Sequence, residues 1–219
     1  MQSELSGCNQ SECYLCGKPA TTRDHIPPQG MFPKPRPDNL ITVPACYNCN
    51  NGRSLDDEYF RVVVSAGSDD SPQSLNLLRQ RIIPQMRERP GLILELMKSA
   101  VWVDINSPGG IYNGRGRALP FDRSRIQAVI DKVVRGLFFK HLGRRLSAGW
   151  LVDDFLYKPS VRGEFQNAIL KLPLYDVGDG SVFSYRCHFS DSSDESFWFL
   201  MFYNDTSLFI TQTSSSISS

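Results

Sequence analysis

Apolar residues recur at helical spacing most clearly between residues 123 and 142. There they stand three or four positions apart, at Ile126, Val129, Ile130, Val133, Val134, Leu137 and Phe138. This period lines one face of an α-helix, and Gly143 is the residue type that most often ends a helix in the left-handed conformation. The pattern therefore predicts a long amphipathic helix over residues 123–142.

Shorter helices are predicted earlier in the chain. One begins at Ser54, whose hydroxyl can cap the first turn and which is followed by acidic residues that suit the positive end of a helix dipole. Two more are expected over residues 73–83 and 92–100. Pro84 and the Pro90-Gly91 pair separate them, because proline has no N–H to continue a helix.

Alternating and continuous apolar runs predict strands elsewhere. Residues 101–105 favour a strand, and the turn-forming SPGG and NGRG after them predict a hairpin or an exposed loop over residues 106–119. Residues 182–189 alternate between apolar and polar, as a strand with one buried face does. Residues 197–203 are apolar throughout, which indicates a strand buried on both faces. A turn then leads into a strand over residues 208–211, so we expect an antiparallel meander.

These segments predict an α+β fold with two domains between disordered ends. We expect residues 1–12 to be disordered, and likewise the serine-rich tail of residues 214–219. Residues 13–66 form the first domain, and its proline-rich start has so few long apolar runs that something besides apolar burial must hold it. Residues 73–213 are expected to form a mixed helical and antiparallel-sheet domain, for which the sequence indicates no role.

Composition and charge exclude several classes of protein. Of the 219 residues, 41% are hydrophobic and 21% are charged, as in ordinary globular proteins. The net charge of +1 lacks the general basic footprint of a nucleic-acid-binding protein, so any such contact must come from local clusters. The polar start is unlike a signal peptide, and no apolar run has the length of a membrane span. We therefore expect a soluble cytoplasmic protein with no membrane contact.

Four of the six cysteines form two Cys-x-x-Cys pairs, Cys13 with Cys16 and Cys46 with Cys49. In a reducing compartment such pairs favour a metal over disulfides. Each pair offers two thiolates from one tight turn, and two pairs complete the tetrahedron that Zn²⁺ prefers. A site of four thiolates has no open position, so we expect a structural zinc that supplies the folding energy which the segment otherwise lacks.

Polar residues of a second kind lie between and after these pairs. Asp24-His25 follows the first pair, Asn39-Leu40 precedes the second, and Asn50 comes directly after Cys49. In this order the residues resemble the zinc-containing HNH endonucleases, whose core is the ββα-metal fold. Among these the chain is most similar to the endonuclease VII-like variant, in which the pattern is His-Asn-Asn. The resemblance covers residues 13–61.

The resemblance implies a role for each of these residues in the hydrolysis of phosphodiester bonds in DNA, with RNA not excluded. His25 is the general base, because a histidine near its ordinary pKa accepts a proton from water at neutral pH. Asp24 and Asn50 are ligands of a catalytic divalent metal, and their hard oxygen atoms suit Mg²⁺ or Mn²⁺. Asn39 holds the loop so that His25 points correctly. Asp57 and Glu58 are further candidate ligands, although acidic residues are common at the start of a helix.

Each assignment has an alternative. His25 can be an ordinary loop histidine, and Asn39 can be a turn residue. Asn50 is flanked by Asn48 and Asn51, either of which can stand in its place.

Nucleic-acid contacts outside the motif are expected at Arg115 and Arg117. Glycines beside them allow a loop to approach phosphates closely. Like any other basic cluster of the chain, these arginines can instead belong to a solvated surface. The chain can also act as a homodimer or with a partner protein.

Two other functions fit the same sequence. A zinc-ribbon module that binds nucleic acid without catalysis explains the four cysteines, but it gives Asp24, His25 and Asn50 no purpose. A nuclease subunit of a phage-defence system, active only with a partner protein, fits the sequence as well as a nuclease that acts alone.

Overall fold

The computed structural model describes residues 12–68, 71–88, 90–107, 109–118, 120–147, 149–156, 164–191, 193–204 and 207–215. The start of the chain that we expect to be disordered lies outside these residues except for Glu12, which pairs with Pro19 in an isolated β-bridge. In the expected tail, Ser214 and Ser215 are instead paired with a neighbouring strand, and residues 216–219 lie outside the description. The architecture combines helices with antiparallel sheets, as the α+β prediction requires.

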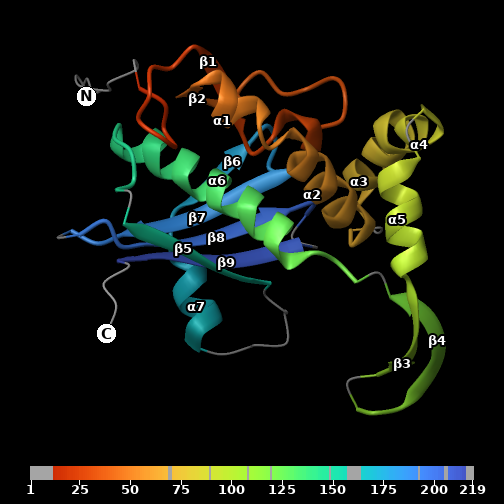
Figure 1. Cartoon of the computed structure of the whole chain (residues 1–219). Helices are drawn as coiled ribbons and strands as arrows, with labels where there is room; N and C mark the ends of the chain where they lie inside the picture. Colours follow the sequence, from red (N-terminus) through yellow and green to blue (C-terminus); the bar gives the residue numbers. More distant parts are fainter. Residues whose placement is uncertain are drawn as a thin grey trace.

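A five-stranded sheet forms the C-terminal part of the molecule (Figure 1). Its strands are β5 (Trp150–Leu156), β6 (Leu174–Val177), β7 (Phe183–Phe189), β8 (Ser196–Phe202) and β9 (Ser207–Ser215). They lie in the order β5-β9-β8-β7-β6, and every neighbouring pair is antiparallel. The predicted meander is confirmed as β7, β8 and β9, whereas the sequence pattern does not predict the two edge strands.

The central strand β8 is buried on both faces, as predicted. Trp198 and Phe202 belong to the main apolar core. Phe199 and Met201 alternate with them and belong to a smaller cluster on the opposite face. Helix α7 (Glu164–Leu170) covers this smaller cluster, so the sheet has a helix on each side.

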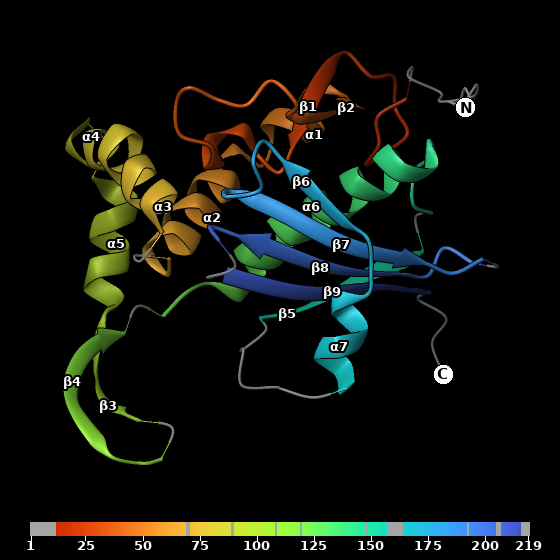
Figure 2. The same ribbon diagram turned by 180° about the vertical axis from the view of Figure 1, so that it is seen from behind.

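Helix α6 (Arg123–Leu142) crosses the face of the sheet opposite α7 (Figure 2). Its bounds agree with the predicted range, and its apolar stripe is buried in the main core. The Asp122 carboxylate caps the first turn by accepting the backbone N–H of Ser124, and Gly143 ends the helix with a φ of 67°. None of the described helices combines the length and the apolarity that crossing a membrane requires.

A second, two-stranded sheet packs on α6 near the start of the chain. Strands β1 (Thr22–Ile26) and β2 (Ile41–Ala45) form an antiparallel hairpin, with the short 3-10 helix η1 (Gln29–Met31) in the connection. Helices α1 (Tyr47–Asn51) and α2 (Ser54–Ala66) follow. The order is therefore strand, strand and helix. The predicted helix start at Ser54 is confirmed, but the predicted cap by its hydroxyl is wrong, because Arg53 is the N-cap residue and no side chain caps this helix.

One apolar core runs through both parts of the chain. The ring centroids of Phe60 in α2 and Phe202 in β8 are 5.4 Å apart. Gly136 of α6 lies so close to β1 that a Cβ on it would be 2.5 Å from Ile26 Cδ1. The described parts of residues 13–66 and 73–213, which we expect as two domains, therefore share this core.

Four helical segments lead from α2 toward a second hairpin: α3 (Pro72–Leu77), η2 (Leu78–Ile82), α4 (Ile83–Glu88) and α5 (Gly91–Ser99). The predicted break at Pro84 is wrong, because the helix continues through it. Segment η2 is a π-helix in which the N–H of Ile83 donates to the carbonyl of Leu78, five residues back. This wider turn places Pro84 near the start of a new helical segment, a position that tolerates its missing N–H.

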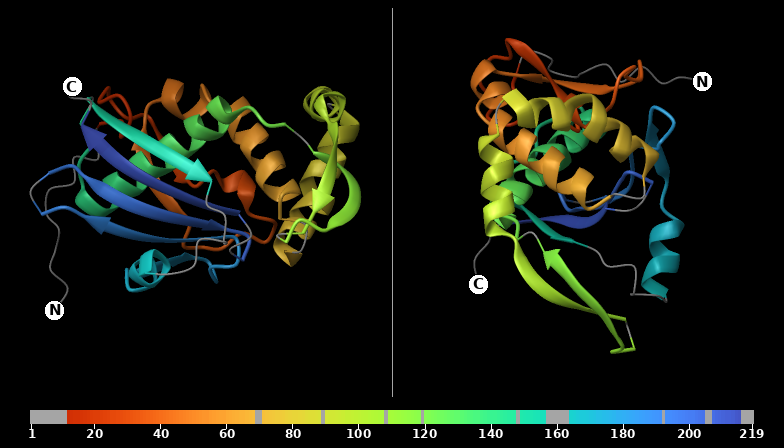
Figure 3. Two further views of the ribbon diagram at one scale, coloured as in Figure 1. Left: turned by 90° about the horizontal axis from the view of Figure 1, so that it is seen from below. Right: turned by 90° about the vertical axis from the view of Figure 1, so that its right-hand side faces the viewer.

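The second hairpin projects from the body of the molecule (Figure 3). Its strands are β3 (Val101–Asn106) and β4 (Tyr112–Ala118), paired antiparallel. The hairpin alternative for residues 106–119 is therefore confirmed. All six residues of β3 are exposed, and Trp102 has an exposed fraction of 61%.

Candidate functional site

The first cysteine pair lies in a tight turn before β1. The carbonyl of Cys13 accepts the N–H of Gly17 at 2.9 Å, and the N–H of Cys13 donates to the carbonyl of Lys18 at 2.7 Å. Gly17 has a φ of +74°, which glycine adopts without a steric penalty. The turn brings the thiols of Cys13 and Cys16 together, as in a metal-binding knuckle.

The second pair opens helix α1. Cys46 is the N-cap residue, and its sulfur accepts the backbone N–H of Cys49 at 3.4 Å. This hydrogen bond lowers the pKa of the Cys46 thiol to about 7, so the thiolate, which is the form that binds metals, is accessible near neutral pH. The sulfur atom that caps the helix is thus also one of the four candidate metal ligands.

The four sulfur atoms gather into one cluster. All of them lie within 4.8 Å of one another, and Cys16 Sγ is 3.7 Å from Cys46 Sγ. A tetrahedron with Zn–S bonds of about 2.3 Å has sulfur atoms about 3.8 Å apart. None of the four cysteines forms a disulfide. They are therefore close enough to hold a metal ion, and zinc fits their number and spacing.

The cluster closes the open end of the β1–β2 hairpin. The N–H of Tyr14 donates to the carbonyl of Pro44, and the N–H of Thr21 donates to the carbonyl of Ala45, both at 3.0 Å. A metal ion bound here would tie the turn before β1 to the helix after β2, and would thereby help to hold β1, which carries Asp24-His25.

Asp24 and His25 are neighbours on β1 and face opposite ways. In the hairpin register Asp24 pairs with Val43 and His25 with Thr42. Successive side chains of a strand alternate between its faces, so Asp24 is buried, with an exposed fraction of 4%, while His25 is half-buried. The two side chains therefore meet different surroundings.

Asp24 belongs to a buried group of charges. Its Oδ2 accepts the hydroxyl of Tyr14 at 2.9 Å and lies 3.2 Å from Lys132 Nζ. The same ammonium group lies 3.0 Å from Asp57 Oδ2. Lys132 has no exposed surface, so it is a fixed cation between two carboxylates. One charge from α6 thus joins β1 to α2.

Burial and charge oppose each other in this group. Burial raises the pKa of Asp57, whereas Lys132 lowers it through its charge and its hydrogen bond. Burial and the Asp24 carboxylate both raise the pKa of Tyr14 well above its ordinary value, so its hydroxyl stays protonated and donates. Asp57, a candidate ligand by sequence, therefore shares Lys132 with Asp24, and its Oδ1 is buried without a hydrogen-bond partner.

The ring of His25 has no hydrogen-bond partner within the described part of the chain. Burial lowers its pKa, and the Asp24 carboxylate opposes this effect. The positive charges of Arg36, Arg23 and Lys132 lower it further. His25 is therefore neutral at pH 7, with a ring nitrogen able to accept a proton.

Asn50 of α1 reaches the backbone of β1. Its Nδ2 donates to Thr22 Oγ1 at 3.0 Å and to the carbonyl of Arg23 at 3.1 Å. Asn51, a neighbour that can stand in its place by sequence, instead bonds back within α1. The structure thus brings Asn50 to the strand that carries Asp24, although no hydrogen bond joins their side chains in the described region.

Asn39 lies in the loop before β2. Its Oδ1 accepts the backbone N–H of Gly178 at 2.7 Å, in the turn between β6 and β7. The side chain thus ties the β1–β2 connection to the five-stranded sheet. Any effect of Asn39 on His25 acts through the position of this loop.

Arg115 and Arg117 lie on β4 of the projecting hairpin. Arg115 Nε is 3.3 Å from Asp104 Oδ1, in an ion pair whose side chains are both more than half exposed. Arg117 pairs with Trp102 in the strand register, and its side chain lies outside the description. This hairpin and the β1–β2 hairpin lie at opposite ends of the molecule (Figure 1).

Sequence reasoning misses two members of the buried charge group, Tyr14 and Lys132. Tyr14 stands inside a Cys-x-x-Cys pair, where nothing in the pattern indicates a hydrogen bond to a carboxylate. Lys132 does give a signal, because it follows Val129 by one helical turn and is next to Val133 in the apolar stripe of α6. A buried lysine needs a partner of opposite charge, but periodicity does not say which.

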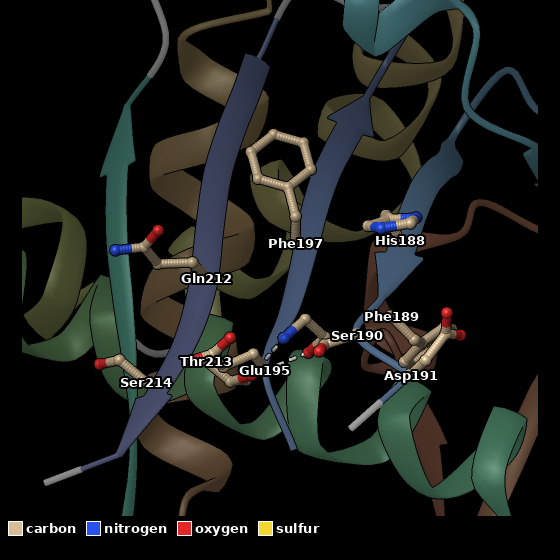
Figure 4. Close-up of a pocket in the computed structure, with 10 residues that line it drawn as sticks. His188, Phe189, Ser190, Asp191, Glu195, Phe197, Gln212, Thr213 and Ser214 are labelled. Atoms are coloured by element: carbon tan, nitrogen blue, oxygen red, sulfur yellow. Dashed lines mark hydrogen bonds between the residues drawn. The ribbon is translucent and has the colours of Figure 1, made fainter. Parts of the chain in front are cut away.

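A wide hollow at one end of the five-stranded sheet contains none of the predicted site residues. It has a volume of about 770 Å³, and His188, Phe197 and Gln212 line it from three neighbouring strands (Figure 4). Asp191 and Glu195 also line it. Among the described residues, the four cysteines are the only group of three or more histidine, cysteine or acidic side chains close enough to hold a metal ion. The described residues of this hollow therefore form no such group.

Comparison with known proteins adds no relative. Family models, curated proteins and solved structures gave no match to this chain. The family resemblance therefore rests on the motif within residues 13–61.

Proposed function

We propose that this chain is a metal-dependent endonuclease that hydrolyses phosphodiester bonds in DNA, built on an HNH core of the ββα-metal type. The observation that carries the proposal is the half-buried ring of His25, which has no partner among the described residues and lies on a hairpin closed by the four-cysteine cluster. The succession β1, β2, α1 and α2 supports the proposal, because the family implies this order. Asn50 supports it too, since its side chain reaches the strand of Asp24 and His25.

Zn²⁺ is the ion proposed for the four-cysteine cluster. Four thiolates leave no open position, so this ion is structural and binds no reacting water. It stabilises the proline-rich segment that surrounds β1 and thereby fixes the position of His25.

A second divalent ion, Mg²⁺ or Mn²⁺, is proposed near Asp24 and Asn50. The donors fit in kind, because a carboxylate and an amide carbonyl are hard oxygen ligands, and Mg²⁺ usually takes only one or two protein carboxylates beside waters and phosphates. When bound, such an ion offsets negative charge at the scissile phosphate. Lys132 positions the Asp24 carboxylate through their contact of 3.2 Å.

His25 is proposed to accept a proton from the attacking water. A ring nitrogen can do so only while the histidine is neutral, and burial together with nearby positive charge lowers its pKa and keeps it neutral. Arg23 and Arg36 supply that charge beside the ring, where it also attracts the phosphates of a substrate.

The test is cleavage of supercoiled DNA with added Mg²⁺ or Mn²⁺ by the wild type, His25→Ala and His188→Ala. His188 is an exposed histidine on β7 and serves as the matched control. A general base contributes about 10²–10⁴-fold, so we expect a loss of this size for His25→Ala alone, with unchanged zinc content and Tm. If His25→Ala protein cuts at the wild-type rate, the assignment fails. Linear, branched and single-stranded DNA and RNA in the same assay identify the substrate.

The rate should also depend on pH in a defined direction. Cleavage falls as His25 becomes protonated, and because its pKa is lowered in the folded protein, the fall lies below the ordinary value of about 6.5. The unfolded chain takes up this proton at higher pH than the folded one. His25 therefore also lowers the free energy of unfolding as the pH decreases from about 6.5 through the lowered pKa.

A zinc-stabilised module that binds nucleic acid without cutting it is the second candidate. The observation that favours it is the Asp24 carboxylate, which already has Tyr14 and Lys132 as partners. This candidate predicts that the protein binds DNA and retains zinc, but produces no cleavage of any of these substrates with Mg²⁺ or Mn²⁺.

A further inference from the structure

A basic hollow lies between the β1–β2 connection and the π-helical segment η2. It has a volume of about 650 Å³. Cationic side chains line it from both sides, Lys34 and Arg36 from the connection and Arg81 from η2. Phe32 and Leu77 contribute apolar surface, and both are buried. None of the described residues that line the hollow is acidic.

Gln80 holds the two sides of the basic hollow together. Its Oε1 accepts the backbone N–H of Lys34 at 2.9 Å, and its Nε2 donates to the carbonyl of the same residue at 3.1 Å. Nε2 also donates to Asn76 Oδ1 at 3.1 Å, which fixes the amide on the helix. Two hydrogen bonds between Gln80 and the backbone of Lys34 therefore hold the β1–β2 connection, with its cations, at a fixed distance from Arg81.

Two residues that line the basic hollow belong to the π-helical segment η2. Gln80 and Arg81 both belong to the five residues of η2. A π-turn is rare because its hydrogen bonds are poorer than those of an α-helix, and it is found mostly at functional sites. Here it directs Gln80 and Arg81 toward the β1–β2 connection.

The positive charges of the basic hollow are not neutralised within the described part of the chain. No carboxylate there forms an ion pair with Lys34, Arg36 or Arg81, and Arg36 Nε is buried with no hydrogen-bond partner. A buried guanidinium donor without an acceptor is unfavourable. An anion in the hollow would provide the missing acceptor.

A fourth cation stands behind the basic hollow. Arg61 of α2 is buried, and its Nε also has no partner. A Cβ on Gly30 would lie 2.7 Å from Arg61 Nη1 and 3.7 Å from Arg81 Cζ, so the Arg61 guanidinium packs closely against this backbone and that of Arg81 lies nearby. Burial and the charge of Arg81 both lower the pKa of Arg61. Arg61 and Arg81 are thus like charges close to each other, while the carboxylates of Glu58 and Asp57 act on Arg61 in the opposite sense.

The basic hollow also has a fixed relation to β1. Arg36 belongs to the connection that leaves the strand after His25, and its charge acts on the His25 ring. A phosphate held by Arg36 is therefore near the residue that we propose as the general base.

We propose that the basic hollow binds a backbone phosphate of the nucleic-acid substrate, next to the phosphate at which His25 acts, with Arg36 and Arg81 as its hydrogen-bond donors. The guanidinium fork suits phosphate oxygens in two directions at once. The position next to the scissile phosphate rests on the proposed nuclease function, whereas phosphate binding itself does not.

The test measures the binding of fluorescein-labelled duplex DNA, without added divalent metal, by fluorescence anisotropy over a series of salt concentrations. Arg36→Gln and Arg81→Gln are compared with Arg79→Gln, which removes the same charge from the same π-turn but does not line the hollow. We expect each of the first two to weaken binding about tenfold. The slope of log K against log salt should decrease by about 0.9 for each. Arg79→Gln should bind like the wild type.

Other outcomes separate this proposal from the nuclease proposal. If Arg36→Gln and Arg81→Gln bind DNA like Arg79→Gln, the phosphate site is wrong even in a protein that cuts DNA. If they lose binding while His25→Ala still cuts, the site stands and the catalytic assignment fails. Arg36→Lys keeps the charge but loses the fork, so its affinity should lie between those of the wild type and Arg36→Gln, with the salt slope of the wild type. A loss as large as that of Arg36→Gln together with a lowered Tm would indicate a merely structural role. Inorganic phosphate is the alternative ligand. If it raises the Tm of the wild type but not of Arg36→Gln, while both proteins bind DNA equally well, the ligand is free phosphate and the proposal is overturned.

Discussion

The β1–β2 and β3–β4 hairpins of this chain are similar in size but differ in burial. The strand β1 reads TRDHI and is mostly polar, whereas β3 reads VWVDIN and is mostly apolar. Yet β1 buries Asp24 and Ile26, and all six residues of β3 are exposed. Apolarity along a strand therefore does not decide which hairpin is buried here.

Long-range partners explain the difference. An isolated two-stranded hairpin is marginally stable at best. The β1–β2 hairpin has the four-cysteine cluster at its open end, Lys132 beneath Asp24, and Gly136 against Ile26. The β3–β4 hairpin has none of these supports among the described residues, and its one ion pair is exposed. Each support can be removed by one substitution, and the resulting loss of stability can be measured.

Loss of a metal ligand should have the largest effect. Cys16→Ser replaces the exposed cysteine of the cluster and so disturbs little packing. Structural zinc contributes roughly 10–16 kcal/mol to small domains that depend on it. We expect the variant to lose zinc, and the amides of β1 and β2 to lose protection from hydrogen exchange, while those of β3 and β4 exchange as in the wild type. Full zinc content with unchanged β1 protection would show that the cluster does not support this hairpin.

Removal of the buried cation should come second. Lys132→Met keeps the length of the side chain but leaves Asp24 and Asp57 buried without it, which typically costs about 3–5 kcal/mol. Lys140→Met, at an exposed position of the same helix, is the control and should change the free energy of unfolding in urea by no more than about 0.5 kcal/mol.

The Lys132→Met variant also has an expected pH dependence. The pKa of Asp57 is raised by burial even in the presence of Lys132, and the loss of that cation raises it further. A native state that binds protons more tightly than the unfolded chain gains stability as the pH falls. The difference in stability between the variant and the wild type should therefore shrink toward acidic pH, and a constant difference would contradict the ion-pair explanation.

The close contact between α6 and β1 should have a smaller effect. In Gly136→Ala the new Cβ meets Ile26 Cγ1 and Cδ1, each at 2.5 Å, and such overpacking costs about 1–3 kcal/mol. The better helix propensity of alanine returns up to about 1 kcal/mol. We expect a net loss in urea denaturation that Ile26→Val, which removes Cδ1, partly reverses in the double variant. Additive losses would show that the two residues do not press on each other.

The sequence predicts the parts of this fold that local patterns control. Helix α6 has a cap at Asp122 and a left-handed Gly143, so its ends follow from neighbouring residues, and strand β8 follows from a continuous apolar run. The break expected at Pro84 is wrong because the π-turn before it is not visible in periodicity. The edge strand β5 lacks a signal because what makes it a strand is pairing with β9.

The candidate site divides in the same way. The spacing of the cysteines is sufficient to predict their cluster, because each pair is local and the metal needs four ligands. The Asp24-His25 pair is visible as a motif, but its two opposite environments depend on Lys132 and Arg36, which belong to other elements. Local patterns in one sequence do not identify which residues from distant segments come into contact.

Removal of the exposed ion pair should have the smallest effect of all. Arg115→Gln breaks the contact of 3.3 Å with Asp104 on the projecting hairpin, where both side chains are more than half exposed. Water and salt screen such a pair, so we expect a loss of about 0–1 kcal/mol in urea denaturation, less at higher salt. The loss of unfolding free energy in Lys132→Met should then be several-fold larger than in Arg115→Gln, because the ion pairs of Lys132 are buried and that of Arg115 is exposed. A loss above about 2 kcal/mol would mean that another surface shields this pair in solution, and the contrast between the two hairpins would then hold only for the isolated chain.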